Sequence, residues 1–176
     1  MTKILVADDH DLVRMGIVRM LADVEDFEVV GEAKTGEEAV KLAREMCPDV
    51  VLMDLKMPGI GGLEATRKIQ TACESARVIA VTALSDEMFT ERLMKAGALG
   101  YVTKGAGFDE IVNAIHTVMR GSLYMSSDIA QQLALKNFGG KTETSPFAQL
   151  SERELQTAIM IAHGNKVTQI ADAFCV

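Results

Sequence analysis

The stretch Val50-Val51-Leu52-Met53-Asp54 is apolar at four consecutive positions and then ends in a carboxylate. A strand that faces water on one side alternates apolar and polar residues, so an unbroken apolar run indicates a strand buried on both faces. The run Val78–Val81 has the same character. Such strands are typical of parallel sheets that carry helices on both faces.

Working outward from this stretch, short β-branched runs alternate with helical periodicity over residues 1–121. Five strands are predicted, at Ile4–Ala7, Phe27–Glu32, Val50–Met53, Val78–Thr82 and Gly100–Thr103. Between and after them, apolar residues recur about every 3.6 positions, which predicts five helices. The first helix would bury Leu12, Val13, Ile17 and Leu21. Strict alternation predicts an α/β fold with a parallel, doubly wound sheet.

Residues 122–176 follow a different pattern. Ser126-Ser127-Asp128 can cap a helix, and residues 139–146 have the composition of a flexible linker. Ser151, with Glu154 three residues later, has the capping-box pattern of a new helix. A second short helix is predicted from Val167 to Phe174. We therefore expect one α/β domain over 1–121, a linker with a helix over 122–146, and an all-α segment over 147–176.

Composition narrows the class of protein. The chain has 176 residues, 48% hydrophobic and 24% charged, which is enough apolar material for a globular core. Its formal net charge is -7, and residues 122–176 carry four basic and five acidic side chains, so charge alone does not indicate nucleic-acid binding. The longest apolar runs are strand-sized and predict no membrane span. Three scattered cysteines and no secretory signal predict a reduced, cytoplasmic setting.

Carboxylates, hydroxyl groups and a lysine lie at the carboxyl ends of four of the five predicted strands. The residues at these ends are Asp8-Asp9, Asp54, Thr82-Ala83 and Thr103-Lys104. Because the carboxyl ends of parallel strands meet at one edge of a sheet, these side chains should converge. Three close carboxylates repel one another and call for a divalent cation, and ligation by oxygen alone favours Mg²⁺. A central carboxylate such as Asp54 can attack phosphorus as a nucleophile. Lys104 and the Thr82 hydroxyl would then stabilise the phosphoryl oxygens.

Other phosphate-binding and catalytic patterns are missing from the sequence. Neither GxGxxG nor GxxxxGK occurs, and the three histidines suggest no Ser/His/Asp arrangement. His10 lies beside the acids and is interpreted as a loop residue that shields the site. A HAD-type phosphatase also forms an aspartyl phosphate, but it needs an Asp two residues after the nucleophile, where this chain has Lys56.

Four segments together resemble the receiver domain of two-component response regulators: Val6–His10, Met53–Gly59, Val81–Ala83 and Tyr101–Lys104. The resemblance covers residues 1 to about 121 and implies a flavodoxin/CheY-like sheet of five strands in the order 2-1-3-4-5. It implies that Asp54 accepts a phosphoryl group from a sensor histidine kinase. It further implies that Mg²⁺ is held by Asp8, Asp9, Asp54 and the backbone carbonyl of Lys56. The implied phosphate-binding and switch residues are Thr82, Ala83, Tyr101 and Lys104.

Leu150–Glu154, Gly164–Lys166 and Gln169–Ala171 resemble the opening of a LuxR-type helix-turn-helix domain of the NarL/FixJ branch. The recognition helix of that domain is absent from residues up to Val176, so we expect promoter binding only in a full-length protein. The resemblance implies phosphorylation-controlled transcription, with a sensor kinase of hybrid type and a phosphorylation-dependent homodimer as partners. No enzymatic activity is expected beyond transient phosphorylation and dephosphorylation of Asp54. The alternative is a receiver-only adaptor that acts through protein contacts.

Overall fold

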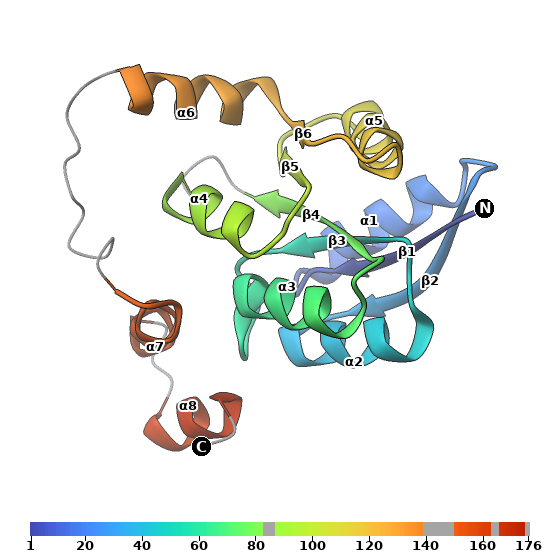
Figure 1. Cartoon of the computed structure of the whole chain (residues 1–176). Helices are drawn as coiled ribbons and strands as arrows, with labels where there is room; N and C mark the ends of the chain where they lie inside the picture. Colours follow the sequence, from blue (N-terminus) through green and yellow to red (C-terminus); the bar gives the residue numbers. More distant parts are fainter. Residues whose placement is uncertain (83–86, 139–149, 163–165, 175–176) are drawn as a thin grey trace.

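The computed structural model of the chain describes residues 1–82, 87–138, 150–162 and 166–174 (Figure 1). The predicted linker at 139–146 and the predicted switch residue Ala83 lie outside the described residues. The elements follow one another in the order β1 (Thr2–Ala7), α1 (Asp11–Leu21), β2 (Phe27–Ala33), α2 (Gly36–Met46), β3 (Val50–Asp54), α3 (Gly61–Ala72), β4 (Arg77–Thr82), α4 (Glu87–Lys95), β5 (Gly100–Thr103), α5 (Phe108–Met119), β6 (Tyr124–Met125), α6 (Ser127–Phe138), α7 (Glu152–Ala162) and α8 (Val167–Phe174).

The sheet confirms the predicted α/β architecture and adds one strand to it. Its order is β2-β1-β3-β4-β5-β6, and every neighbouring pair is parallel. The first five strands stand in the expected order. The two-residue strand β6 is a difference from the five-stranded prediction, because a run this short leaves no pattern in the sequence. It pairs with β5 and therefore forms the edge of the sheet.

Helices cover both faces of the sheet (Figure 1). Side chains alternate along a strand, so each inner strand supplies residues to two cores. Leu5, Val51 and Ala80 belong to the core under α2, α3 and α4, while Val6 and Leu52 belong to the core under α1 and α5. β3 is buried at all five positions, as its apolar run predicts.

The buried stripe of α1 differs from the predicted one. Leu12 is 85% exposed and Val13 is 39% exposed, so their predicted burial is wrong. The buried residues of α1 are Arg14, Ile17 and Leu21, which recur at the same helical spacing. An arginine therefore occupies the position at the start of the stripe where an apolar residue was expected.

Side-chain caps begin α2 and α7, and the predicted capping box of Ser151 and Glu154 is confirmed. The Thr35 side chain accepts a hydrogen bond from Glu38 N, and Ser151 and Glu154 cap each other reciprocally, with Ser151 N donating to Glu154 Oε2 at 2.7 Å. Gly97 ends α4 with a φ of 95°. Ser126 differs from its prediction: its hydroxyl is buried and has no hydrogen-bond partner among the described residues.

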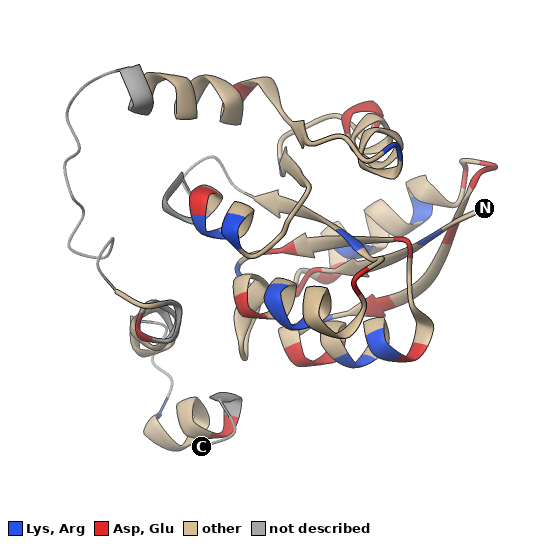
Figure 2. Cartoon of the chain, in the orientation of Figure 1, with Lys and Arg blue, Asp and Glu red and all other residues tan. Residues whose placement is uncertain are grey.

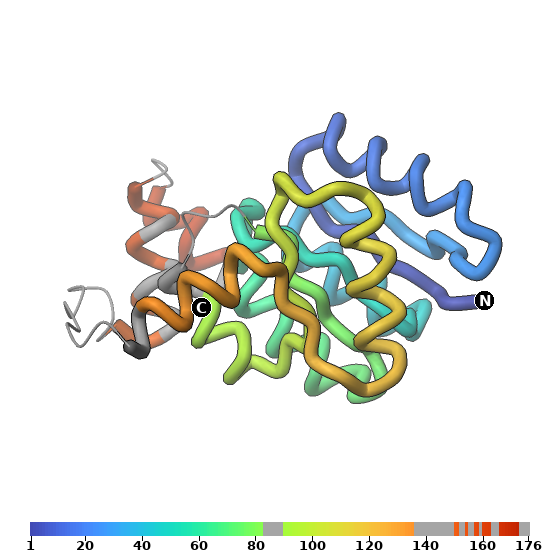
Figure 3. The backbone as a smooth tube through the Cα atoms, turned by 90° about the horizontal axis from the view of Figure 1, so that it is seen from above, coloured from blue at the N-terminus to red at the C-terminus, as the bar shows by residue number. Residues whose placement is uncertain are grey.

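Residues 122–138 extend the sheet region before the chain reaches α7. Tyr124 N donates to Leu99 O and Ser126 N donates to Tyr101 O, both at 2.9 Å. α6 then packs against α4 and β5 through Ile129. Helices α7 and α8 lie at the opposite end of the molecule from the N-terminus in both views (Figures 1 and 3).

None of the described helices has the length and apolar character that crossing a membrane requires.

Gly62 tests how tightly α3 approaches the end of β3. A Cβ at Gly62 would overlap the carbonyl oxygen of Asp54 and lie 2.8 Å from the Cα of Leu55. We expect Gly62→Ala to lower the free energy of unfolding by about 1–3 kcal/mol, because backbone atoms would have to move. Gly16→Ala in α1 is the control, since nothing lies within 4 Å of its Cβ position. That variant should be neutral or slightly stabilising in the same urea titration, and equal losses in both variants would contradict the prediction.

Candidate functional site

Two buried carboxylates lie side by side at the carboxyl edge of the sheet. Asp8 follows β1 directly and Asp54 is the last residue of β3, and β1 and β3 are adjacent parallel strands. Both residues are only 2% exposed. The register that pairs Ala7 with Met53 brings the two acids together. Their proximity is thus a direct result of the strand pairing.

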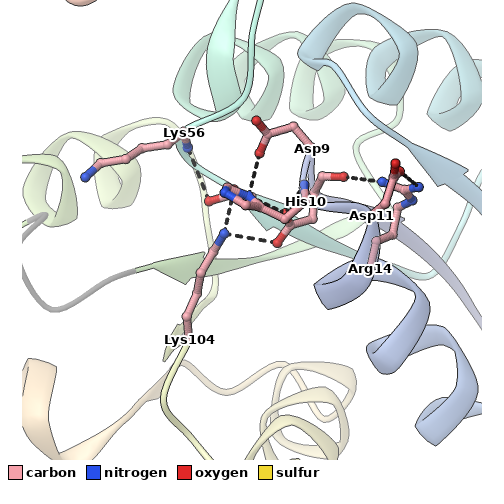
Figure 4. A network of polar contacts seen from close by, with 8 residues as sticks. Asp9, His10, Asp11, Arg14, Lys56 and Lys104 are labelled. Carbon is pink, nitrogen blue, oxygen red and sulfur yellow. Dashed lines mark hydrogen bonds and ion pairs between the residues drawn. The ribbon is translucent and has the colours of Figure 1, made fainter.

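Lys104 reaches this pair from the other side of the sheet edge. It follows β5, and its backbone N–H donates to Thr82 O at 2.7 Å. Its Nζ donates to Asp54 Oδ2 at 2.7 Å and lies 3.1 Å from Asp8 Oδ2 (Figure 4). The ammonium group therefore bridges the two buried carboxylates.

Asp9 and His10 complete the cluster at its solvent side. The Asp9 side chain is 31% exposed and that of His10 is 60% exposed. His10 Nδ1 lies 2.8 Å from Asp9 Oδ1 and 3.1 Å from Asp8 Oδ1. One candidate ligand atom from each of Asp8, Asp9, His10 and Asp54 lies within 4.8 Å of the others. His10 thus stands over the acids, where the sequence analysis placed it.

The electrostatics of the cluster favour additional positive charge. Burial raises the pKa of Asp54 above its ordinary value, and the Asp8 carboxylate adds to this, although the hydrogen bond from Lys104 opposes both. Burial would lower the pKa of Lys104, but its hydrogen bond and charge interaction with Asp54, together with its interaction with Asp8, outweigh burial and raise it. One ammonium group therefore does not balance the carboxylates around it.

The donor set fits a hard divalent cation. Asp8 Oδ2 and Asp9 Oδ1 are buried atoms with ion-pair contacts only, and neither makes a hydrogen bond within the described part of the chain. Such oxygens retain lone pairs that a cation can use. Carboxylate oxygens are the ligands that Mg²⁺ and Ca²⁺ prefer, and a partly exposed Asp9 leaves room for water ligands. The cluster can thus hold a metal ion.

The remaining predicted site residues lie near the cluster or in the core beside it. The Lys56 N–H donates to Asp54 Oδ1 at 3.2 Å. Thr82 is buried at the end of β4, next to β3. Tyr101 is fully buried, and its hydroxyl donates to Ala98 O at 3.1 Å, so this side chain is engaged inside the fold.

The sequence analysis missed Arg14, which binds the turn that carries the acids. Arg14 is 5% exposed, and its Nη1 donates to the backbone carbonyl of Asp8 at 2.7 Å. Its other nitrogens contact Asp11 and Glu32. The spacing of Arg14 in the sequence could have indicated its burial, because Arg14, Ile17 and Leu21 form one helical stripe. A cation in a buried stripe needs polar partners.

Comparisons with known proteins agree with this arrangement. Residues 4–116 match the family of the response regulator receiver domain. The chain is 58% identical to the response regulator GacA of Pseudomonas aeruginosa over 176 residues, which are 100% of this chain and 82% of that protein. It is 50% identical to the response regulator UvrY of Escherichia coli K12 over 172 residues, 98% of this chain and 79% of that protein.

Solved structures place the fold in the same group. A two-component response regulator of the LuxR family from Aurantimonas sp. SI85-9A1 is 41% identical, with a TM-score of 0.74 over 78% of this chain and 98% of that one. The chain belongs to the two-component response regulators that control transcription, and residues 4–116 are its receiver domain.

Proposed function

We propose that Asp54 is the phosphoacceptor of this response regulator and receives its phosphoryl group from a sensor histidine kinase. The observation that supports this best is the placement of Asp54, which is buried at the end of β3 and held 2.7 Å from Lys104 Nζ beside a second carboxylate. A nucleophilic carboxylate needs nearby cations to bring a phosphoryl group close, because both groups are negatively charged. Lys104 supplies one such charge.

In this proposal a bound Mg²⁺ would be held by Asp8, Asp9, Asp54 and the backbone carbonyl of Lys56, and it would neutralise phosphoryl oxygens. An Asp54 oxygen forms a bond to phosphorus while the bond to the donor histidine nitrogen breaks, which gives an acyl phosphate. Lys104 pairs with a phosphoryl oxygen, and the hydroxyl of Thr82 donates to another. Hydrolysis of the acyl phosphate returns Asp54 to its free form. The proposal thus includes transient self-phosphorylation and dephosphorylation but no turnover of another substrate.

The output is proposed to pass through the face formed by α4 and β5. Thr82 and Tyr101 are the proposed switch residues, and Tyr101 is already buried beneath this face in the present structure. The C-terminal segment contacts the same region, since Arg92 Nη2 of α4 donates to Leu150 O at 2.7 Å. Differential contacts to the phosphoryl group would shift the packing here, because a ligand favours the state that it binds better.

The proposed partners follow from this assignment. A sensor kinase of hybrid type would supply the phosphoryl group, and a homodimer would form on phosphorylation. Promoter DNA is the proposed target of the output, bound through a recognition helix of the helix-turn-helix type. A cytoplasmic location belongs to the same proposal, in keeping with the free thiols of Cys47 and Cys73.

Asp54→Asn tests the phosphoacceptor. We expect acetyl phosphate with Mg²⁺ to add one phosphoryl group to the wild-type chain and none to the variant, because an amide oxygen is a poor nucleophile. Intact-protein mass spectrometry measures the addition. Asp109→Asn, an exposed carboxylate in the first turn of α5, is the matched control and should be labelled normally. Undiminished labelling of Asp54→Asn would refute the assignment.

The same variant has a predicted effect on stability without metal. Burial raises the folded-state pKa of Asp54, so above that pKa the ionised carboxylate lowers the free energy of unfolding. This destabilisation is lost as the pH falls through the raised pKa toward the ordinary value of 3.8. Asp54→Asn should therefore unfold at a higher urea concentration than the wild type at pH 7. The difference should shrink toward pH 4. Urea titrations in a chelating buffer measure it, and a constant difference across this pH range would contradict the stated cause.

The switch has a spectroscopic test. We expect beryllofluoride with Mg²⁺, which mimics the phosphoryl group, to change the NMR signals of Thr82 and Tyr101. Signals of Cys47, at the C-terminal end of α2, serve as an internal control and should stay in place. If beryllofluoride binds and the NMR signals of Thr82 and Tyr101 do not change, these two residues are not part of the switch.

A further inference from the structure

The buried guanidinium of Arg14 binds three separate parts of the chain. Its Nη1 donates to Asp8 O at 2.7 Å, its Nε donates to Glu32 Oε2 at 3.1 Å, and its Nη2 donates to Asp11 Oδ1. These partners belong to the turn after β1, to strand β2 and to helix α1. Figure 4 shows Arg14 on the opposite side of the turn from Lys104. The turn that carries the acids therefore has a cation on each side.

The contact with Asp8 O has a geometric consequence for both acids of the turn. The carbonyl of Asp8 and the N–H of Asp9 belong to one peptide unit, which is planar. The N–H of Asp8 is also fixed, because it donates to Ala33 O of β2 at 3.1 Å. Arg14 therefore sets the orientation of the peptide that joins the two carboxylate-bearing residues, and with it the direction in which their side chains leave the backbone.

The anionic partners of Arg14 are themselves held in place. Lys34 Nζ lies 2.8 Å from Asp11 Oδ1, and hydrogen bonds from Lys34 and Arg14 lower the pKa of Asp11 to about 2. Glu32 is the next-to-last residue of β2 and is anchored by pairing with Val6. All three kinds of nitrogen in the guanidinium group are used, which a lysine with its single nitrogen cannot reproduce.

We propose that Arg14 is a positioning residue for the acidic site, which holds the Asp8–Asp9 peptide in the orientation that binds Mg²⁺ and so supports phosphorylation of Asp54. This inference rests on the proposed function of the site. Arg14 acts through the peptide backbone and touches neither the cation nor the phosphoryl group. Groups that orient metal ligands commonly affect metal affinity by about 10–100-fold when they are replaced.

The test compares Arg14→Lys with Arg19→Lys in the full chain. Arg19 lies on the exposed face of the same helix, so it controls for the loss of an arginine from α1. We expect Arg14→Lys to weaken Mg²⁺ binding about tenfold by isothermal titration calorimetry and Arg19→Lys to change it less than twofold. Labelling by acetyl phosphate should slow in Arg14→Lys at low Mg²⁺ and recover at saturating Mg²⁺, because Asp54 itself is unchanged.

Urea unfolding without Mg²⁺ separates positioning from a purely structural role. A variant that is less stable but binds Mg²⁺ within twofold of the wild type would overturn the proposal. If Arg14→Lys fails to fold, Glu32→Gln takes its place, because it weakens one of the three contacts of Arg14. This variant should reduce Mg²⁺ affinity about two- to threefold. Unchanged Mg²⁺ affinity in Glu32→Gln would also overturn the proposal. If the wild-type chain binds no Mg²⁺, the proposed function is overturned as well. If the wild type binds Mg²⁺ and the variants bind it equally well, only the role of Arg14 is refuted.

Discussion

Electrostatic repulsion among carboxylates at one edge of the sheet is the constraint on which this structure depends. Parallel pairing of β1 with β3 forces Asp8 against Asp54, and Asp9 adds a third negative charge beside them. The chain as a whole is acidic, with a net charge of -7, so its overall charge does not offset the repulsion among these carboxylates. Local cations and backbone anchors therefore decide whether the acids stay in place.

The surrounding fold meets this constraint with rigid elements. β3 is buried over its whole length, and α3 begins so close to the end of this strand that Gly62 N donates to Leu55 O at 3.1 Å. Figure 2 shows that basic side chains are spread over several helices, so the acidic edge is not neutralised by a general basic surface. Lys104 and Arg14 both contact the turn that carries the acids, Lys104 at the carboxylates and Arg14 at the backbone. The proposed reactivity of Asp54 would thus depend on a few fixed contacts.

Much of this arrangement could be predicted from sequence because parallel sheets impose a simple rule. Alternating strand and helix patterns define the layers, and the carboxyl ends of the strands then identify Asp8, Asp9, Asp54 and Lys104 as neighbours. The strand order came from the resemblance to receiver domains, and the structure confirms it. These features depend on long, repeated patterns, which a single sequence shows clearly.

The missed features depend on single contacts between distant residues. Arg14 is polar and was not expected in a core, yet Asp8 O and the carboxylates of Glu32 and Asp11 satisfy its guanidinium group. Leu12 was expected to be buried because apolar residues usually define a helix stripe, but the register of α1 is shifted to include Arg14. β6 has two residues and arises only because β5 offers it an open edge. Local periodicity contains no information about such partners.

The short strand β6 also determines where the receiver can be separated from the rest of the chain. Tyr124 and Ser126 donate to the carbonyl groups of Leu99 and Tyr101, and Ile129 of α6 completes the core around Tyr101. A fragment that stops at Gly121 would leave these carbonyl groups on an uncovered edge strand, which is a surface prone to pairing with other chains. A fragment that includes α6 would keep that edge closed. Self-association measured on the shorter piece would therefore reflect the cut rather than a property of the regulator.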